Sequence, residues 1–200
     1  MPSARPVRAT LSSSERKKHE HKLLHSAGIL QDFSELADVR IGLDAPVRSA
    51  SVRALNRLLA HTMAIRDACK KAHWQTSGAT FYELHLLFDK HYNEQVLIMD
   101  SLAERVQTLG GVAFALAQDV AGESAIARAP RGRESARAQL ARLLDAHETI
   151  LIEARPLARA SAEAGDDGSN DLIVSQVVRS NELHSWFIGE HLAAQARKVA

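Results

Sequence analysis

The sequence predicts an all-α protein: a four-helix bundle whose long crossover carries a short helix, preceded by an N-terminal extension. Three observations lead to this prediction. Glycine (10) and proline (5) are scarce among the 200 residues, while alanine and leucine are frequent. Four long segments repeat apolar residues at helical spacing. Two short connections and one long one join these segments, which is a known four-helix topology.

The first two long helices are expected on either side of Ser77 and Gly78. The first begins near residues 46–49, where Pro46 suits a first turn, and the second ends at Gly110 and Gly111. The apolar face of the first has a regular 3,4 spacing: Val52, Leu55, Leu59, Thr62, Ile65, Cys69 and Ala72. The apolar face of the second is formed by Phe81, Leu84, Phe88, Ile98, Leu102, Val106 and Leu109.

The remaining helices follow a connector over residues 111–132, which is expected to hold a short helix near residues 114–120. The third helix covers residues 134–164, and its inward residues are Leu143, Leu144, Ile150, Leu151 and Leu157. After a turn at residues 165–168, the fourth begins at Asn170 or Asp171, ends near Ala196 and directs Ile173, Val177 and Trp186 inward. Residues 46–196 thus form the bundle, and residues 1–45 a basic, His-containing and partly disordered extension.

The composition excludes several classes of protein. A hydrophobic fraction of 46% excludes a wholly disordered chain. The single cysteine, Cys69, excludes a disulfide scaffold, a Cys-based zinc ribbon and an iron–sulfur site, and its place on an apolar face predicts an inert core residue. No apolar run is long enough to cross a membrane, and the first residues contain no segment of signal-peptide type. We therefore expect a cytosolic protein without a membrane partner.

Most of the chemical information lies between His73 and Glu104. His85-x-x-x-Asp89 and Asp100-x-x-x-Glu104 are two i,i+4 pairs, so both members of each pair share a helix face. Histidine and carboxylate together are the ligands of Fe(II), Mn(II) or Zn(II). However, His85 and Asp100 are separated by roughly 22 Å along a straight helix, which is too far for a shared ion.

A two-fold axis resolves this separation. The pair His85 and Glu104 is centred between Glu94 and Gln95, and so is the pair Asp89 and Asp100. Two antiparallel copies of the helix that cross at this centre bring the pairs together and build two identical sites. In each site His73 joins from the chain that contributes His85. The alternative is that these residues are ordinary solvent-exposed side chains of a helix. This alternative is disfavoured because burying their charged groups at a dimer interface without a cation costs free energy.

This stretch resembles the Dps family (DNA-binding proteins from starved cells), the dodecameric miniferritins with a ferritin-like bundle. The resemblance covers about residues 48–192 and is carried by the spacing of the five ligands and by Trp74, Gly78, Phe81, Leu84, Phe88, Tyr92, Arg105 and the Leu109-Gly110-Gly111 run. Weaker similarity continues to Trp186-Phe187-Ile188. The extension is outside the shared core.

The resemblance implies a shell of twelve subunits built from two-fold dimers. It also implies Fe(II) oxidation, preferentially by hydrogen peroxide, and storage of ferric mineral inside. The implied iron ligands, and hence the catalytic residues, are His73, His85, Asp89, Asp100 and Glu104. Conventional ferritins use a Glu-x-x-His motif within one bundle. This chain contains no such motif, which favours the site between subunits.

Trp74 is next to a ligand and is a candidate for quenching stray oxidants by one-electron transfer. A plain packing role at the helix end is the alternative for this residue.

Three aspartates, Asp166, Asp167 and Asp171, cluster before the fourth helix. One interpretation is an acidic funnel at a three-fold pore that draws in Fe(II), which the resemblance supports for Asp167 and Asp171. The other is an N-cap that also interacts with the helix dipole. The two interpretations are compatible.

The extension has two candidate binding features. Between Met1 and His25, six basic residues face two glutamates, and on every subunit of a shell they form a multivalent cationic surface for DNA phosphates: Arg5, Arg8, Arg16, Lys17, Lys18 and Lys22. The alternative is a solubilising tail. The nearby His19, His21 and His25 are candidates for an extra zinc or iron site, or for an idle tract.

The sequence therefore predicts a ferroxidase and iron-storage shell that also binds and protects DNA, in the cytoplasm and associated with the nucleoid. Two alternatives stay open. One is a nucleoid-compacting structural protein with little iron chemistry. The other is a zinc- or manganese-binding protein, which the ligand set alone does not exclude.

Overall fold

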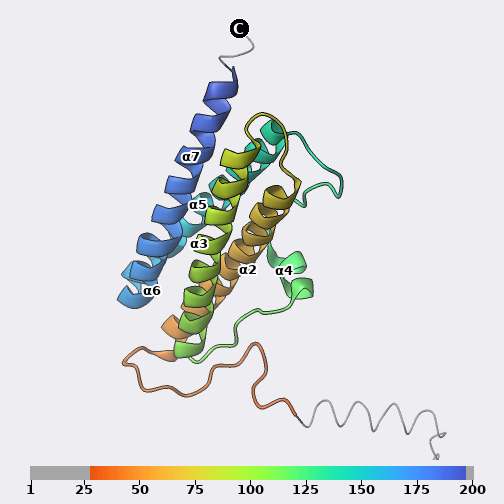
Figure 1. The fold of residues 1–200 in the computed structure, drawn as a ribbon. Helices are drawn as coiled ribbons and strands as arrows, with labels where there is room; N and C mark the ends of the chain where they lie inside the picture. Colours follow the sequence, from red (N-terminus) through yellow and green to blue (C-terminus); the bar gives the residue numbers. More distant parts are fainter. Residues whose placement is uncertain (1–27, 197–200) are drawn as a thin grey trace, which may run out of the picture. The chain divides into compact units, whose positions relative to one another are not determined.

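The computed structural model describes residues 28–196, with side chains to residue 193. From Phe33 onward these residues belong to one unit, while residues 28–32 belong to another. All regular elements in the described range are helices, so the predicted all-α class is confirmed. Four long helical segments lie side by side in the unit that begins at Phe33, and Figure 1 shows their arrangement.

Helices α2 (Ala45–Gln75) and α3 (Phe81–Thr108) form an antiparallel pair, as expected. Pro46 lies in the first turn of α2. Gly78, in the connecting turn, has a φ of 100° that favours glycine. The predicted apolar face of α2 is buried throughout.

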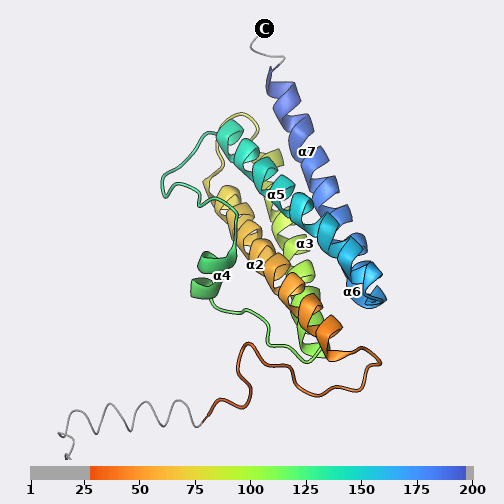
Figure 2. The ribbon, with the colours of Figure 1, turned by 180° about the vertical axis from the view of Figure 1, so that it is seen from behind.

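The crossover over residues 109–135 is needed because α3 and α5 run in the same direction (Figure 1). It carries the short helix α4 (Ala117–Glu123), three residues later than expected, which packs on α2 (Figure 2). Asn56 of α2 holds the start of the crossover in place. Its Nδ2 donates to the carbonyl oxygen of Val112 at 2.9 Å, and its Oδ1 accepts from the amide of Phe114 at 3.0 Å.

Helix α5 (Ala136–Glu163) begins at the N-cap Ser135, whose side chain accepts from the amide of Ala138. The fourth segment is continuous from α6 (Asp167–Leu172) through the π-helix η1 (Ile173–Val178) to α7 (Arg179–Ala196). It begins earlier than expected because Asp166 caps it: the carboxylate accepts from the amide of Ser169 at 3.0 Å.

The core lies between the four segments and contains most of the predicted residues, including Leu84, Phe88 and Leu102 at 0% exposure. Two predictions for the core are wrong. Phe81 is 44% exposed because it is the first residue of α3, at the edge of the bundle. Trp186 is 59% exposed because it is half a turn out of phase with the buried Val177, and Ile188 is buried instead.

None of the described helices combines the length and hydropathy that a membrane span requires.

Candidate metal centre

Two predicted ligands, His73 and His85, lie together where α2 ends and α3 begins. Their rings stack with centroids 3.7 Å apart. Nδ1 of His73 donates to the carbonyl oxygen of His85 at 2.8 Å, and Nδ1 of His85 donates to the carbonyl oxygen of His73 at 3.0 Å. Because a carbonyl oxygen only accepts, both Nδ1 atoms carry the proton. In the neutral form of each ring, Nε2 then has a lone pair for a metal ion.

Asp89 lies one turn after His85 and joins this pair. Its Oδ1 is 3.8 Å from Nδ1 of His73 and accepts a 2.5 Å bond from Nζ of Lys70. This hydrogen bond is the main cause that holds the pKa of Asp89 below its ordinary value. The carboxylate is thus ionised, as a metal ligand must be. Lys70 was not among the predicted residues.

Asp100 and Glu104 are exposed farther along the same helix. Within the described range neither carboxylate has a hydrogen bond or an ion pair, although Glu104 and Asp171 line the same shallow depression beside Arg105. Since α3 is continuous over both pairs, roughly 22 Å of helix separates Asp100 from His85. One chain therefore brings His73, His85 and Asp89 together and leaves Asp100 and Glu104 apart from them.

Trp74 follows His73 but lies on the outside of the helix, with 70% of its surface exposed. Within one chain it is not packed into the bundle, so the packing alternative has no support from the chain's own contacts. Cys69 is fully buried, which confirms its predicted place in the core, and burial raises its pKa to about 12.

The three aspartates before the fourth segment differ in their surroundings. Asp166 is 1% exposed and accepts from Arg105 at 2.5 Å as well as from Ser169. Burial would raise the pKa of Asp166, but the hydrogen bonds of Ser169, Ser51 and Arg105 outweigh it and lower the pKa. The N-cap role is confirmed for Asp166, and the exposed Asp167 and Asp171 are the candidates for a pore.

The predicted features of the extension are outside the part of the chain that the structure describes. These are the six basic residues between Arg5 and Lys22 and the histidines at positions 19, 21 and 25.

One group of candidate ligands was missed. In the described part of the chain, His91, His147 and His184 are the three residues that offer metal-ligating atoms close together, all within 4.8 Å of one another. None of the three is among the candidate ligands predicted from the sequence. A signal was present, since His91 is in phase with the core residues Leu84, Phe88 and Ile98.

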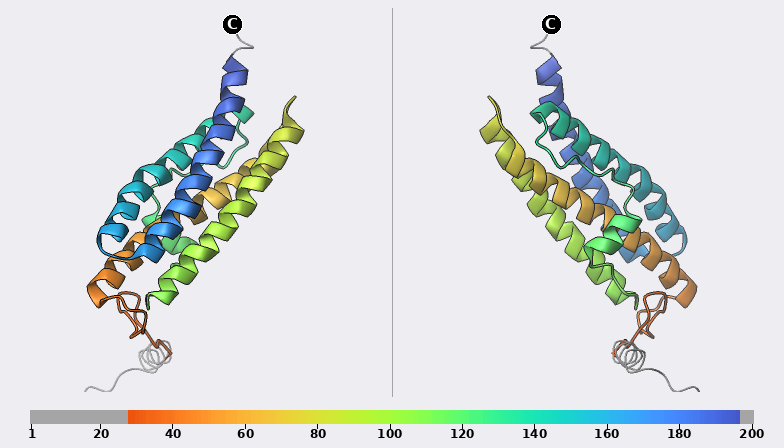
Figure 3. Two further views of the ribbon diagram at one scale, coloured as in Figure 1. Left: turned by 90° about the vertical axis from the view of Figure 1, so that its left-hand side faces the viewer. Right: turned by 90° about the vertical axis from the view of Figure 1, so that its right-hand side faces the viewer.

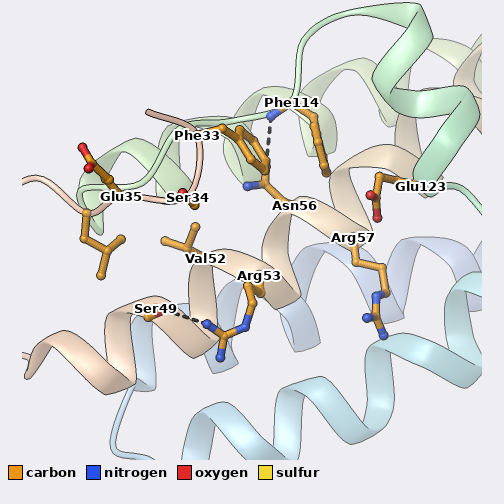
Figure 4. A pocket seen from close by; sticks show the side chains of 11 residues that line it. Phe33, Ser34, Glu35, Ser49, Val52, Arg53, Asn56, Arg57, Phe114 and Glu123 are labelled. Carbon is orange, nitrogen blue, oxygen red and sulfur yellow. Dashed lines mark hydrogen bonds between the residues drawn. The ribbon is translucent and has the colours of Figure 1, made fainter. Parts of the chain in front are cut away.

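A pocket on the face of α2 that carries the crossover has none of the predicted ligands. Figure 4 shows Phe33 and Phe114 at one side of it and Arg53 and Arg57 at the other. The two rings stack with centroids 4.7 Å apart. The chemistry suggested by the sequence is thus located at the α2–α3 turn and along α3, not in this pocket.

Comparisons with known proteins agree with the fold. The model of the ferritin-like domain matches residues 52–197. An uncharacterised protein of Kitasatospora aureofaciens is 44% identical over 154 residues, which cover 77% of this chain and 99% of the relative. A nutrient stress-induced DNA-binding protein of Synechococcus sp. is 29% identical over 175 residues, which cover 88% of this chain and 99% of that relative.

The solved structure of DpsC from Streptomyces coelicolor superposes with a TM-score of 0.81 at 48% identity, covering 82% of this chain and 95% of that one. The range matched by the family model contains most of α2, all of α3 and the fourth segment, so the ferritin-like arrangement predicted from the sequence is confirmed. From the ligand spacing, the bundle and these similarities together, it follows that the chain belongs to the Dps family of ferritin-like proteins.

Proposed function

We propose that the protein is a ferroxidase that oxidises its substrate Fe(II) at sites shared by two copies of the chain and stores the ferric product inside a shell. The observation that carries this proposal is the half-site formed by His73, His85 and Asp89. Two imidazole nitrogens with free lone pairs and one ionised carboxylate suit a borderline divalent ion. Three protein donors are too few to enclose two irons, so a second chain must add the rest.

The outer face of α3 supports the shared site. The exposed apolar side chains Tyr82, Leu86 and Leu97 have 68%, 50% and 68% of their surface exposed. On a helical projection they fall in the same stripe, about 80° wide, as Asp89, Asp100 and Glu104. An apolar stripe interrupted by carboxylates is what a dimer seam that also binds cations requires. The antiparallel crossing then places Asp100 and Glu104 of one copy at the His85 pair of the other.

The reaction that we propose balances with peroxide as the oxidant. Two Fe(II) ions each lose one electron, and hydrogen peroxide takes up the two electrons and two protons to give two water molecules. The carboxylates favour the ferric product through their charge, while the histidines position the ions. Delivery of both electrons to one peroxide avoids a free hydroxyl radical, and Trp74, exposed beside the site, would reduce an oxidant that escapes.

The family supports the larger assembly. A dodecamer of two-fold dimers would enclose the mineral, and the exposed Asp167 and Asp171 at the start of the fourth segment would attract Fe(II) to a pore.

DNA binding is a second proposed activity, and two observations favour it. A relative from Synechococcus sp. is named as a DNA-binding protein, and the first 25 residues of this chain carry six Lys or Arg against two Glu. A shell that displays such a segment on each subunit would associate with the nucleoid through many weak phosphate contacts.

The experiment that tests the ferroxidase compares rates of Fe(II) oxidation by hydrogen peroxide and by dioxygen. We expect a His85→Ala and Asp89→Asn double variant to oxidise Fe(II) at least about tenfold more slowly than the parent chain, because two donors are lost. Glu83→Gln, an exposed change on the same turn, is the control and should leave the rate unchanged. An unchanged rate in the double variant would instead favour the structural DNA-binding protein.

A further inference from the structure

Three histidines meet in the core of the bundle, one from each of α3, α5 and α7. His91, His147 and His184 are each 0% exposed, and one nitrogen of each lies within 4.8 Å of the other two. The rings of His91 and His184 stack at 3.8 Å, and those of His147 and His184 meet edge to face at 5.1 Å. Figure 3 shows α7 between α5 and α3, so the cluster joins three segments that are far apart in the sequence.

The tautomer of His147 is set by Asn181. Nδ2 of Asn181 donates to the carbonyl oxygen of Val177 at 2.6 Å, which fixes the orientation of the amide. Oδ1 of Asn181 therefore accepts from Nδ1 of His147 at 2.7 Å. Nε2 of His147 keeps its lone pair, and this atom is buried without any hydrogen-bond partner.

His184 is held in a similar way by Glu94. Nε2 of His184 donates to Oε2 of Glu94 at 2.5 Å, because a carboxylate only accepts. Burial would raise the pKa of Glu94, but hydrogen bonds from Lys90 and His184 outweigh it and lower the pKa, so the carboxylate is ionised. Nδ1 of His184 is unprotonated, and its lone pair accepts one long hydrogen bond of 3.4 Å from Nε2 of Gln95. A carboxylate behind a histidine is the arrangement that orients metal-binding imidazoles.

The side chain of His91 has no hydrogen bond. Both ring nitrogens are buried without a partner, and so is Oε1 of the neighbouring Gln95. Burying such a group without a hydrogen-bond partner is unfavourable. Burial lowers the pKa of His91 to about 2 and that of His147 to about 3. The imidazoles are therefore neutral at physiological pH, which is the form that binds metal ions.

We propose that His91, His147 and His184 bind one divalent transition-metal ion of the Zn(II) class inside each bundle. Three neutral imidazoles are a ligand set that Zn(II) takes readily. Glu94 and Asn181 hold two of the rings from behind, and the ring of His91, which has no hydrogen bond to lose, turns to direct one nitrogen at the ion. The site is enclosed within a single chain and fastens α5 and α7 to α3. It does not depend on the proposed ferroxidase.

The test measures the zinc that the full-length protein retains after chelation, zinc loading and dialysis. The parent chain should retain one more zinc per chain than His91→Phe, which removes a ligand and fills the space with an apolar ring. His61→Phe changes another fully buried histidine outside the cluster and should retain the parent amount. The His85→Ala and Asp89→Asn variant should keep the core zinc, so a failure of the ferroxidase proposal is recognised separately.

Two further variants keep the proposal falsifiable. If His91→Phe does not fold, His147→Gln removes a ligand while keeping a donor toward Asn181, and should lose the same zinc. Asn181→Ala keeps all three ligands but removes the acceptor of Nδ1 of His147 and of Nε2 of Gln95, and should weaken zinc binding by roughly 10–100-fold. The proposal is overturned if the parent and the ligand variants retain equal zinc, or if zinc raises the melting temperature of His91→Phe as much as that of the parent.

Discussion

Asp166 and Asp167 are adjacent in the sequence and serve different purposes. Asp166 is buried and accepts from Ser169 and Arg105, whereas Asp167 is exposed at the first position of α6. The same residue type thus stabilises the turn at one position and is available to ions at the next. Their burial, which the sequence does not reveal, separates the two roles.

We predict that Asp166→Ala lowers the free energy of unfolding by about 2–4 kcal/mol, because it removes an N-cap and leaves the half-buried Arg105 without its carboxylate partner. Asp167→Ala is the control and should change stability by less than about 0.5 kcal/mol. Urea unfolding monitored by circular dichroism measures both. Equal midpoints for the two variants would contradict the structural role of Asp166.

At the level of the elements, helix α3 presents different groups of residues on its outer and inner sides. Its outer stripe carries Asp89, Asp100 and Glu104, while its inner side places His91 and Gln95 in the core. Neutral buried histidines couple this core to pH. In the unfolded chain an imidazole titrates near 6.5, but in the folded chain burial holds the pKa of His91 to about 2.

The sign of the resulting pH dependence follows from proton binding. Below about pH 6.5 the unfolded chain binds protons that the folded chain does not, so the free energy of unfolding falls as the pH falls. For His91 alone the loss between pH 7.5 and 5.5 amounts to about 1.4 kcal/mol. In the presence of a chelator, His91→Phe should therefore lose about this much less stability than the parent over the same range. Identical losses in both proteins would disprove the account.

The apolar pattern was sufficient to predict some elements and not others. The spacing from Val52 to Ala72 identified α2 and its buried face, since a single periodicity determines both. It did not reveal the π-helix Ile173–Val178, because hydrogen bonding one residue longer than in an α-helix leaves no clear mark on the apolar pattern.

The two groups of proposed metal ligands differ in how far the sequence reveals them. His85, Asp89, Asp100 and Glu104 lie on one helix, so their spacing alone indicates a shared site. The core histidines come from three helices that meet through packing, and no local spacing relates His91 to His147 or His184. The reciprocal bonds of His73 and His85 were likewise not predictable, because they depend on the turn that brings two helix ends together.

At the level of the whole molecule, the basic extension should act through its number of copies. We predict that replacing Arg5, Arg8, Arg16, Lys17, Lys18 and Lys22 by Gln in the full chain abolishes DNA retention in a gel and the steep salt dependence that phosphate contacts produce. A control variant replaces the exposed Arg128, Arg131, Arg133 and Arg137 of the bundle unit by Gln and should retain DNA. Retention by the tail variant at the parent level would remove the DNA-binding proposal.

The central prediction also concerns the whole assembly: no single chain completes an iron site. His85→Ala chains and Glu104→Ala chains are each expected to be inactive, since every site in either protein lacks one ligand. In a mixed dimer one site receives His85 and Glu104 intact, and the other lacks both.

The most direct test is therefore to co-express the two variants in equal amounts and to measure Fe(II) oxidation per subunit. Random pairing makes half of the dimers mixed and half of their sites complete, so the activity should return to about a quarter of the parent value. Co-assembly is verified by native mass spectrometry. Co-assembled chains that stay as inactive as the separate variants would contradict the shared site.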